Sequence, residues 1–262
     1  SCRFLEPGPA AAPEADVILA ETGAPPATAS AAAAPAPRQT AAPGSPQDAG
    51  AITLESDYGA LAREYLEGLV EQAGSRPPGS AEERQAEDYI TAALEALGYR
   101  VERQPFSFST EDGERLESAN LVAVKEGQSD RELLIGAHYD SGDEADGVDD
   151  NASGVAVLLA VAQQLQEIDP VYTVRLVAFG AEENDLDGSR YFASQLTPAQ
   201  PGNILYMINL DSLVAGDNAY LYGNAGGQGD LREWVREDAR QAGLSIQVID
   251  ARKLDDEDGT PC

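Results

Sequence analysis

Side chains that can bind a divalent metal ion gather in one short stretch of this sequence. His138, Asp140 and Asp150 lie within about a dozen residues, and His138 is the only histidine of the chain. An imidazole nitrogen together with several carboxylate oxygens is the kind of ligand set that a zinc-class ion accepts. The alternative interpretation is a solvated acidic loop, which is an ordinary feature of a chain with a formal net charge of −29.

Two other stretches favour a metal site over a solvated loop. Three apolar runs of strand-like composition end at candidate ligands: Leu133–Ala137 at His138, Val171–Gly180 at Glu182 and Glu183, and Ile204–Leu210 at Asp211. In open α/β sheets, ligands bind beyond the carboxyl ends of the strands. We therefore expect these side chains, which are distant in the sequence, to converge at one edge of a sheet.

Composition limits the class of protein and its partners. A chain of 262 residues is long enough for one sizeable α/β domain with extra segments. The charge of −29 argues against nucleic acid or an anionic membrane surface as a partner. The two cysteines, Cys2 and Cys262, lie at opposite ends, which excludes a disulfide scaffold or a thiolate zinc site. No apolar run is long enough to span a bilayer, and the sequence gives no indication of the oligomeric state.

The first fifty residues differ in kind from the rest. From Pro7 to Gly50 the chain is dominated by Ala and Pro, which favours a disordered tether over residues 1–50 and a folded domain over residues 51–262. Ser1-Cys2 before such a tether is typical of a lipoprotein whose signal has been removed, with a lipid on Cys2. That interpretation predicts an extracytoplasmic protein, secreted or lipid-anchored to the cell envelope. A sequence fragment is the alternative.

Hydrophobic periodicity predicts alternating helices and strands over the folded part. Helices are expected over Tyr58–Ala73, Ser80–Gly98, Gly154–Ile168, Leu186–Leu196 and Leu231–Ala242, and further strands over Tyr99–Phe108, Asn120–Val124, Ala219–Tyr222 and Ser245–Ile249. Ser80 with Glu83 is typical of a capping box. A polar hairpin-like loop is expected over Ser109–Glu117, and Arg76–Gly79 is interpreted as a turn without chemistry. The alternation predicts an α/β three-layer sandwich, with helices on both faces of a mixed, mostly parallel sheet.

Four motifs occur in a recognisable order: GAHYDS (136–141), GVDDNASG (147–154), FGAEENDLDGSRYF (179–192) and INLDS (208–212). Together they resemble the signatures of the co-catalytic di-zinc exopeptidases typified by bacterial leucyl aminopeptidase, aminopeptidase Y and glutamate carboxypeptidase. The resemblance covers roughly residues 58–262 and implies the zinc-dependent exopeptidase fold.

The resemblance implies which residues bind metal. His138 and Asp211 would be ligands of one zinc ion, Glu183 would be a ligand of the second, and Asp150 would bridge the two. The family also implies a cis peptide bond before Asn151.

The resemblance also implies which residues serve catalysis. Glu182 would be the general base, taking a proton from water and returning it to the departing amine. Asp140 would orient His138, since residues two apart on an extended chain lie on the same side.

The sequence departs from the family pattern at the second zinc ion. The family takes a late histidine after a segment like Asp258-Gly-Thr-Pro-Cys262, and this chain has no histidine there. One zinc site is therefore complete, whereas the other has only Glu183 and Asp150. We expect that the chain is cut short before this histidine, a strand and a helix, and that the complete protein binds two Zn²⁺ ions. A one-metal or inactive relative is the alternative.

The function predicted from these residues and this resemblance is a zinc-dependent exopeptidase. The first choice is an aminopeptidase that hydrolyses N-terminal residues from a peptide substrate, using a metal-activated water. A carboxypeptidase or another amidohydrolase on the same scaffold is one alternative, and a receptor-like relative without activity is the other. The sequence does not predict the side-chain preference for the substrate.

Overall fold

The computed structural model describes residues 58–142, 145–197, 200–216, 219–223 and 231–250. The predicted tether over residues 1–50, the lipid site at Cys2 and the segment before Cys262 lie outside the described residues. The predictions for these segments stay predictions.

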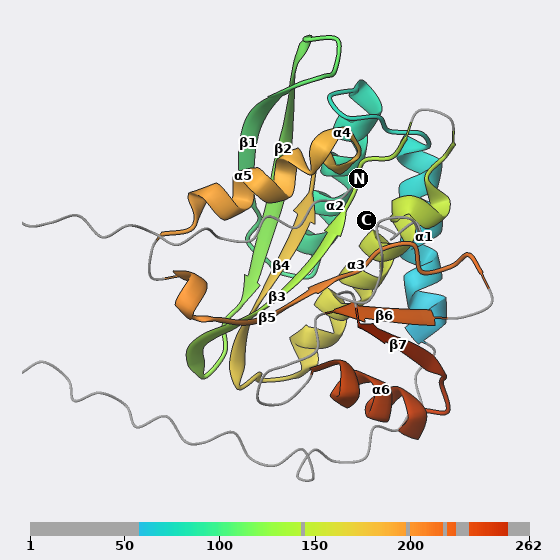
Figure 1. Cartoon of the computed structure of the whole chain (residues 1–262), viewed down its shortest axis with the longest axis vertical. Helices are drawn as coiled ribbons and strands as arrows, with labels where there is room; N and C mark the ends of the chain where they lie inside the picture. Colours follow the sequence, from blue (N-terminus) through green and yellow to red (C-terminus); the bar gives the residue numbers. More distant parts are fainter. Residues whose placement is uncertain (1–57, 143–144, 198–199, 217–218, 224–230, 251–262) are drawn as a thin grey trace, which may run out of the picture.

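A five-stranded mixed sheet forms the centre of the protein (Figure 1). Its strands are β1 (Glu102–Ser109), β2 (Arg115–Lys125), β3 (Ser129–His138), β4 (Tyr172–Phe179) and β5 (Ile204–Asn209), in the spatial order β1-β2-β4-β3-β5. β3 pairs in parallel with both β4 and β5, whereas β2 pairs antiparallel with β1 and β4. Every strand except β2 therefore runs in one direction, as predicted for a mixed, mostly parallel sheet.

Helices cover both faces of this sheet, which confirms the predicted three-layer sandwich (Figure 1). One face carries α1 (Tyr58–Ala73), α2 (Ala81–Ala96) and α3 (Gly154–Gln164), and the other carries α4 (Glu182–Asp185) and α5 (Asp187–Gln195). Short helical turns occur at η2 (Val148–Ser153), η3 (Leu165–Glu167) and η4 (Gln200–Gly202). Among the described residues, no helix has the combination of length and apolar character needed to cross a membrane.

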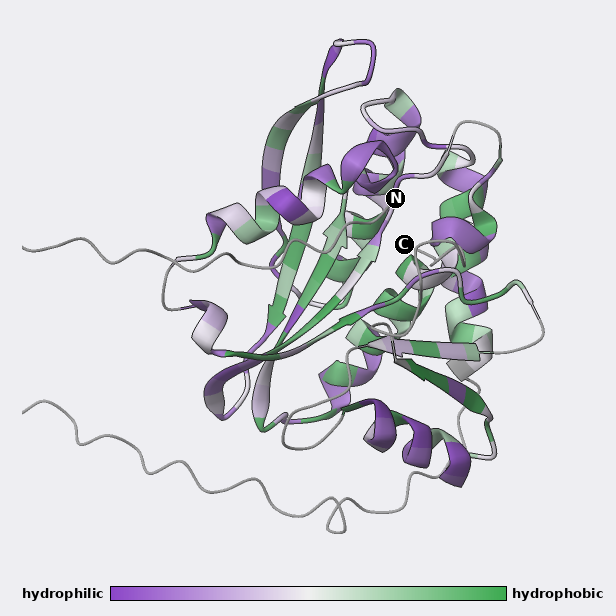
Figure 2. Cartoon of the chain, in the orientation of Figure 1, coloured by the Kyte–Doolittle hydropathy of each residue, from purple (hydrophilic) through white to green (hydrophobic). Residues whose placement is uncertain are grey.

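The core lies on both sides of the central strands. Leu176 and Ala178 of β4 belong to the apolar cluster shared with α1, α2 and α3, whereas Val177 and Phe179 pack with Phe192 of α5. Because both faces are covered, β4 has a nearly continuous apolar sequence instead of an alternating one. Figure 2 shows the same distribution, with hydrophobic colouring concentrated in the central strands and α3 and hydrophilic colouring over α6 (Leu231–Gln241).

α2 begins at the predicted capping box, although one half of the box differs from the prediction. Ser80 is the N-cap, and its Oγ accepts a hydrogen bond from Glu83 N at 2.9 Å. The Glu83 carboxylate accepts a hydrogen bond from Gly79 N at 2.6 Å and turns into the protein interior. The helix therefore starts where the sequence indicates, but Glu83 has a further role in the interior.

The hairpin between β1 and β2 is tighter than predicted. Ser109 pairs with Arg115 in antiparallel register, so only residues 110–114 form the turn and the predicted loop over Ser109–Glu117 was too long. Arg115 and Glu117 are exposed strand residues, and their polarity reflects contact with solvent. At the other end, β1 begins at Glu102 rather than at the predicted Tyr99.

The last described strands form a separate unit. β6 (Ala219–Gly223) and β7 (Ile246–Asp250) pair in parallel as a two-stranded sheet, and α6 packs against it. Within the described ranges, neither strand pairs with the five-stranded sheet. The elements themselves match the prediction, with ends shifted by a residue.

Candidate metal centre

Three parallel strands end at the same edge of the sheet and deliver polar side chains there. His138 is the last residue of β3, Asp211 follows the end of β5, and Glu182 opens α4 just after β4. Because β3 pairs in parallel with both neighbours, the carboxyl ends of the three strands adjoin. The structure brings these side chains together, as the strand endings indicated.

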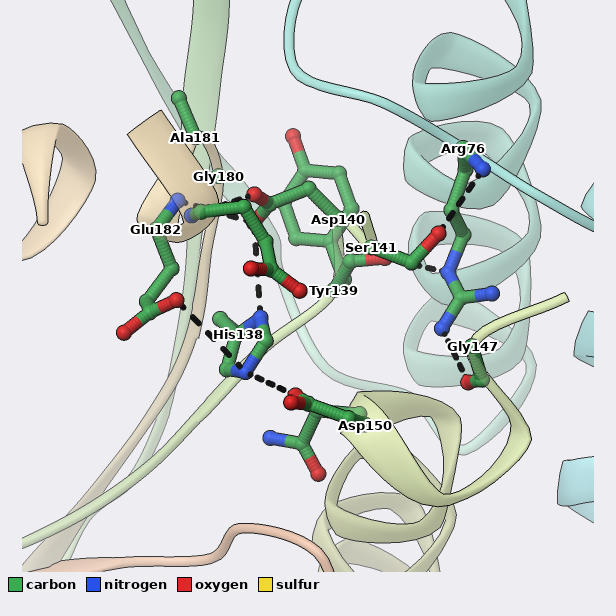
Figure 3. Close-up of polar contacts among 12 residues, drawn as sticks. Arg76, His138, Tyr139, Asp140, Ser141, Gly147, Asp150, Gly180, Ala181 and Glu182 are labelled. Atoms are coloured by element: carbon green, nitrogen blue, oxygen red, sulfur yellow. Dashed lines mark hydrogen bonds and ion pairs between the residues drawn. The ribbon is translucent and has the colours of Figure 1, made fainter. Parts of the chain in front are cut away.

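Ligand atoms of His138, Asp150 and Asp211 all lie within 4.8 Å of one another. Nε2 of His138 is 3.0 Å from Oδ1 of Asp150 and 3.8 Å from Oδ1 of Asp211. His138 is buried, whereas Asp150 is exposed and Asp211 is intermediate, so the cluster opens to solvent on its carboxylate side. Figure 3 shows the Asp150 carboxylate directed at the imidazole.

Asp150 reaches this cluster because η2 lies against the end of β5. η2 contains the cis peptide bond between Asp150 and Asn151 that the family resemblance implied. The Asn151 side chain donates to the carbonyl of Leu210 at 2.8 Å and accepts from Gly154 N at 2.9 Å. A Cβ atom at Gly154 would lie 2.3 Å from the Leu210 oxygen, so glycine is required for this close approach. Asp150 and Asp211 are thereby held side by side.

Asp140 is fully buried and has different main partners from those predicted. Its Oδ1 and Oδ2 accept hydrogen bonds from Glu182 N and Glu183 N, each at 3.0 Å. Its distance to Nδ1 of His138 is 3.7 Å, which is an ion-pair distance and too long for a hydrogen bond. The shortest contacts of Asp140 are therefore with the start of α4, and its contact with the His138 imidazole is longer.

Glu182 and Glu183 begin α4 and lie in different surroundings. Ala181 before them has φ +52°, a left-handed conformation that turns the chain sharply at the end of β4. Oε2 of Glu182 lies 4.0 Å from Nε2 of His138, and burial raises the pKa of Glu182 to about 7. Burial also raises the pKa of Glu183, which lines a pocket with Asp150 but does not belong to the three-residue cluster.

The charges at the cluster are strongly coupled. Burial lowers the pKa of the His138 imidazole, but Asp140, Asp150 and Asp211 together raise it well above its ordinary value. The hydrogen bond and charge of His138 lower the pKa of Asp150, against the effect of burial. Nε2 of His138 can face these carboxylates as a protonated donor, or as a neutral ligand when a cation lies between them. One imidazole nitrogen and two carboxylates suit zinc, so the residues present fit this ion.

A pocket of about 560 Å³ opens beside the cluster. Four of its lining residues are acidic: Asp146, Asp149, Asp150 and Glu183. The others are Gly142, Ala145, Gly147 and Val148. None of these lining residues is basic, so the pocket is suited to a cationic group and unsuited to an anionic one.

Sequence interpretation missed two buried charged residues behind the cluster. Arg76 is 0 % exposed and Glu83 is 2 % exposed. The sequence pattern places Arg76 in a turn without chemistry, yet its guanidinium contacts Tyr139 and Gly147 on the chain that leads to Asp150, as Figure 3 shows. The capping-box pattern drew attention to Glu83, but no local pattern indicates its burial.

Comparison with known proteins gives a match to Peptidase family M28 over residues 120–259. The chain is 30% identical over 193 residues to the "Alkaline phosphatase isozyme conversion protein" of Escherichia coli K12, covering 65% of this chain and 55% of that protein. It is 32% identical over 136 residues to the "Probable lipoprotein aminopeptidase LpqL" of Mycobacterium tuberculosis, covering 50% of this chain and 27% of that protein. The chain thus spans about half or less of these relatives.

A solved structure with the same fold is BSAP, described as a zinc aminopeptidase from Bacillus subtilis. The TM-score is 0.66 at 17% identity, and the alignment covers 73% of this chain and 79% of that one. At this identity the likeness establishes the fold.

Proposed function

The chain belongs to peptidase family M28, and on that basis we propose that it is a zinc-dependent exopeptidase that acts as an aminopeptidase. The observation that carries the proposal is the cluster of His138, Asp150 and Asp211, whose ligand atoms lie within 4.8 Å, with Glu182 beside it. These residues come from separate segments of the chain, and the match to the family includes all of them.

In this proposal His138, Asp150 and Asp211 hold one zinc ion. A bound zinc ion acts as a Lewis acid on a carbonyl oxygen and lowers the pKa of water. Glu182 accepts a proton from the attacking water at its carboxylate and returns it to the departing amine. A pKa of about 7 suits a group that must both take up and release a proton near neutral pH. Asp140 keeps Glu182 in place through the backbone N–H that it accepts.

Charge in the pocket favours an aminopeptidase over a carboxypeptidase. A substrate of an aminopeptidase brings a free ammonium group to the site, whereas a substrate of a carboxypeptidase brings a free carboxylate. Asp146 and Asp149 add negative charge to the pocket beyond that of Asp150 and Glu183, and no basic residue lines it. With Asp150 and Glu183 engaged on zinc, the remaining negative charge of Asp146 and Asp149 favours an ammonium group over a carboxylate.

We further propose that Glu183 and Asp150 contribute to a second zinc ion, with Asp150 shared between the two. Support comes from their common pocket and from the charge of Asp150, which helps raise the pKa of Glu183. Metal analysis of the full-length protein tests the number of ions. Two zinc atoms per chain are expected, and one would limit the site to His138, Asp150 and Asp211.

We also propose an extracytoplasmic location, with a lipid on Cys2 as the attachment to the envelope. The Ala- and Pro-rich sequence over residues 7–50 and the relative described as a lipoprotein aminopeptidase support this. Fractionation of cells that express the protein from its complete gene, with Cys2→Ala as the control, tests it. The natural protein should be found in the membrane fraction, and the variant should be released. Equal distribution of the two would contradict lipid attachment.

Hydrolysis of paired substrates tests the proposed activity. Full-length protein is assayed on aminoacyl p-nitroanilides, on the same compounds with an acetylated amine, and on peptides that carry a free C-terminus and a blocked N-terminus. Cleavage of the free-amine substrates alone is expected, with loss on chelation and recovery on addition of zinc. Cleavage of the N-blocked peptides would indicate a carboxypeptidase, and no chelator-sensitive cleavage of any substrate would favour an inactive relative.

A further inference from the structure

The segment of residues 74–83, which is the α1–α2 connection together with the first turn of α2, touches both halves of the metal centre from behind. It joins two packing helices and supplies none of the proposed zinc ligands. Arg76 and Glu83 within it are nevertheless among the most buried charged side chains that the structure describes. Since burial of a charge is costly unless its hydrogen bonds are satisfied, the contacts of these two residues indicate what they hold.

Arg76 holds the loop that leads from Asp140 to Asp150. Its guanidinium donates through Nε to the carbonyl of Tyr139 at 2.5 Å and through Nη2 to the carbonyl of Gly147 at 2.8 Å. Nη1 donates to the carbonyls of Gly74 and Asp146, at 2.7 and 2.8 Å. Four of the five N–H donors of an arginine are thus used on backbone oxygens. The loop is fixed at both of its ends.

The backbone of Arg76 adds two more bonds to the same loop. Arg76 N donates to Ser141 Oγ at 3.0 Å, and Ser141 N donates to Arg76 O at 3.2 Å. Gly147 has φ +53° and no space for a side chain, since a Cβ atom there would lie 2.4 Å from Cβ of Ser141, 2.7 Å from the Asp150 carbonyl oxygen and 3.0 Å from Nη2 of Arg76. The residues around Arg76 therefore fit closely around its side chain (Figure 3).

Glu83 holds the turn that presents Glu182. Its Oε1 accepts hydrogen bonds from Ala181 N at 3.2 Å and from Ser118 Oγ at 2.6 Å, and its Oε2 accepts from Gly79 N at 2.6 Å. Asp140 accepts the next two backbone N–H groups, as described above. Three successive amides, 181 to 183, are therefore bound by two buried carboxylates.

The Glu83 site requires a carboxylate and not merely a polar side chain. Both of its oxygens accept a backbone N–H, one from Gly79 and one from Ala181. A glutamine has one oxygen and one amide nitrogen, so either orientation would set its NH₂ group against one of these donors. The isosteric variant therefore breaks one contact while it preserves the volume.

We propose that Arg76 and Glu83 are positioning residues with separate tasks. Arg76 fixes the loop that carries Asp150 and so sets zinc affinity, whereas Glu83 fixes the turn that carries Glu182 and so sets the rate of the proton-transfer step. The kinetic part of this inference rests on the proposed peptidase function, whereas the parts measured by zinc binding and by amide exchange do not.

The Arg76→Lys variant tests the first task. Lysine places its donors on a single ammonium and cannot span the carbonyls of Tyr139 and Gly147 together. Competition with a chromogenic chelator should show zinc affinity reduced by about 10- to 100-fold. The matched control is Arg63→Lys on the exposed face of α1, which should bind zinc like the wild-type protein.

The Glu83→Gln variant tests the second task. Zinc affinity should stay within about threefold of wild type, because the loop held by Arg76 is untouched, while kcat should fall by about 100-fold with little change in KM. Hydrogen exchange of the zinc-loaded protein should be faster at the amides of residues 181–183. Glu82→Gln, an exposed neighbour on α2, is the matched control.

Two less disruptive variants test the same two tasks if Arg76→Lys or Glu83→Gln prevents folding. Ser141→Ala removes the acceptor of the Arg76 backbone N–H and should weaken zinc binding in the same direction as Arg76→Lys. Ser118→Ala removes one donor to Glu83 and should lower kcat without weakening zinc binding.

The inference depends on whether zinc affinity and kcat change in different variants. If Arg76→Lys or Ser141→Ala binds zinc like wild type, or if the Glu83 and Ser118 variants keep wild-type kcat and amide exchange, the assigned task is overturned. The inference also fails if all variants lower zinc affinity and kcat in parallel with their loss of thermal stability. A wild-type protein that binds zinc but cleaves no peptide refutes the proposed function alone, because zinc affinity and amide exchange still report the two tasks.

Discussion

Glu83 gives the stability of this protein a pH dependence whose sign and size follow from the structure. Burial raises the pKa of its carboxyl from 4.5 to about 7, and the hydrogen bonds from Ser118, Gly79 and Ala181 act in the opposite direction. The unfolded chain exposes this carboxyl and restores the ordinary value. Folding therefore raises the pH at which Glu83 ionises, and the carboxylate that accepts these hydrogen bonds is fully formed only above about pH 7. The resulting contribution to stability is fully present below pH 4.5, the unfolded pKa, and is lost as pH rises through about 7.

The magnitude comes from the difference between the two pKa values. The rise from 4.5 to about 7 corresponds to about 3 kcal/mol in the free energy of unfolding between the low-pH and high-pH limits. Between about pH 5 and pH 8 the change attributable to Glu83 is about 2 to 3 kcal/mol. Glu83→Gln removes the titrating group, so the difference between wild type and variant isolates this contribution from that of every other carboxyl.

Urea denaturation of the metal-free proteins at a series of pH values measures this difference. The unfolding free energy of wild type minus that of Glu83→Gln should fall steadily from pH 5 to pH 8. The exposed control Glu82→Gln should differ from wild type by a constant amount. A difference that is flat with pH, or one that increases with pH, would refute the inference that the folded protein favours the protonated form of Glu83.

Three further predictions concern the site and the core. Glu182→Gln should lower kcat by about 10²- to 10⁴-fold in steady-state assays, while zinc titration shows binding unchanged, because the proton acceptor is lost and the ligands are not. Asp211→Asn should weaken zinc binding by at least about tenfold in chelator competition. The control Asp185→Asn, whose side chain is 67% exposed, should bind zinc like wild type, and equal zinc affinities of the two variants would remove Asp211 from the ligand set. Leu158→Ala should lower the free energy of unfolding by about 2 to 5 kcal/mol in urea, since Leu158 is 0% exposed, and unchanged stability would place it outside the packed core.

The sequence predicts well those features that have a local cause. His138, Glu182 and Asp211 each follow an apolar run that forms a strand, and parallel strands end at one edge, so their convergence follows from the order of the elements. The alternation of apolar segments likewise predicts the layers and most element bounds. Where bounds differ, as at Ser109–Glu117, polar residues on an exposed strand resemble a loop.

Features caused by contacts between distant segments were not predictable in this way. Arg76 lies in a turn rich in glycine and proline, and its burial depends on residues 63 to 71 positions further along the chain. Glu83 fits a helix cap, yet it reaches Ala181, which is 98 positions away. Asp140 shows the same limit, because its strongest partners are backbone amides at the start of α4, a helix of only four residues.

The central claim is that His138, Asp150 and Asp211 bind one zinc ion at the end of the sheet. A crystal structure of the zinc-loaded protein with anomalous data at the zinc edge tests it most directly. The expected result is a zinc peak about 2.0 to 2.2 Å from Nε2 of His138 and from a carboxylate oxygen of each aspartate. A peak elsewhere, or Asp150 or Asp211 turned away from the ion, would contradict the claim.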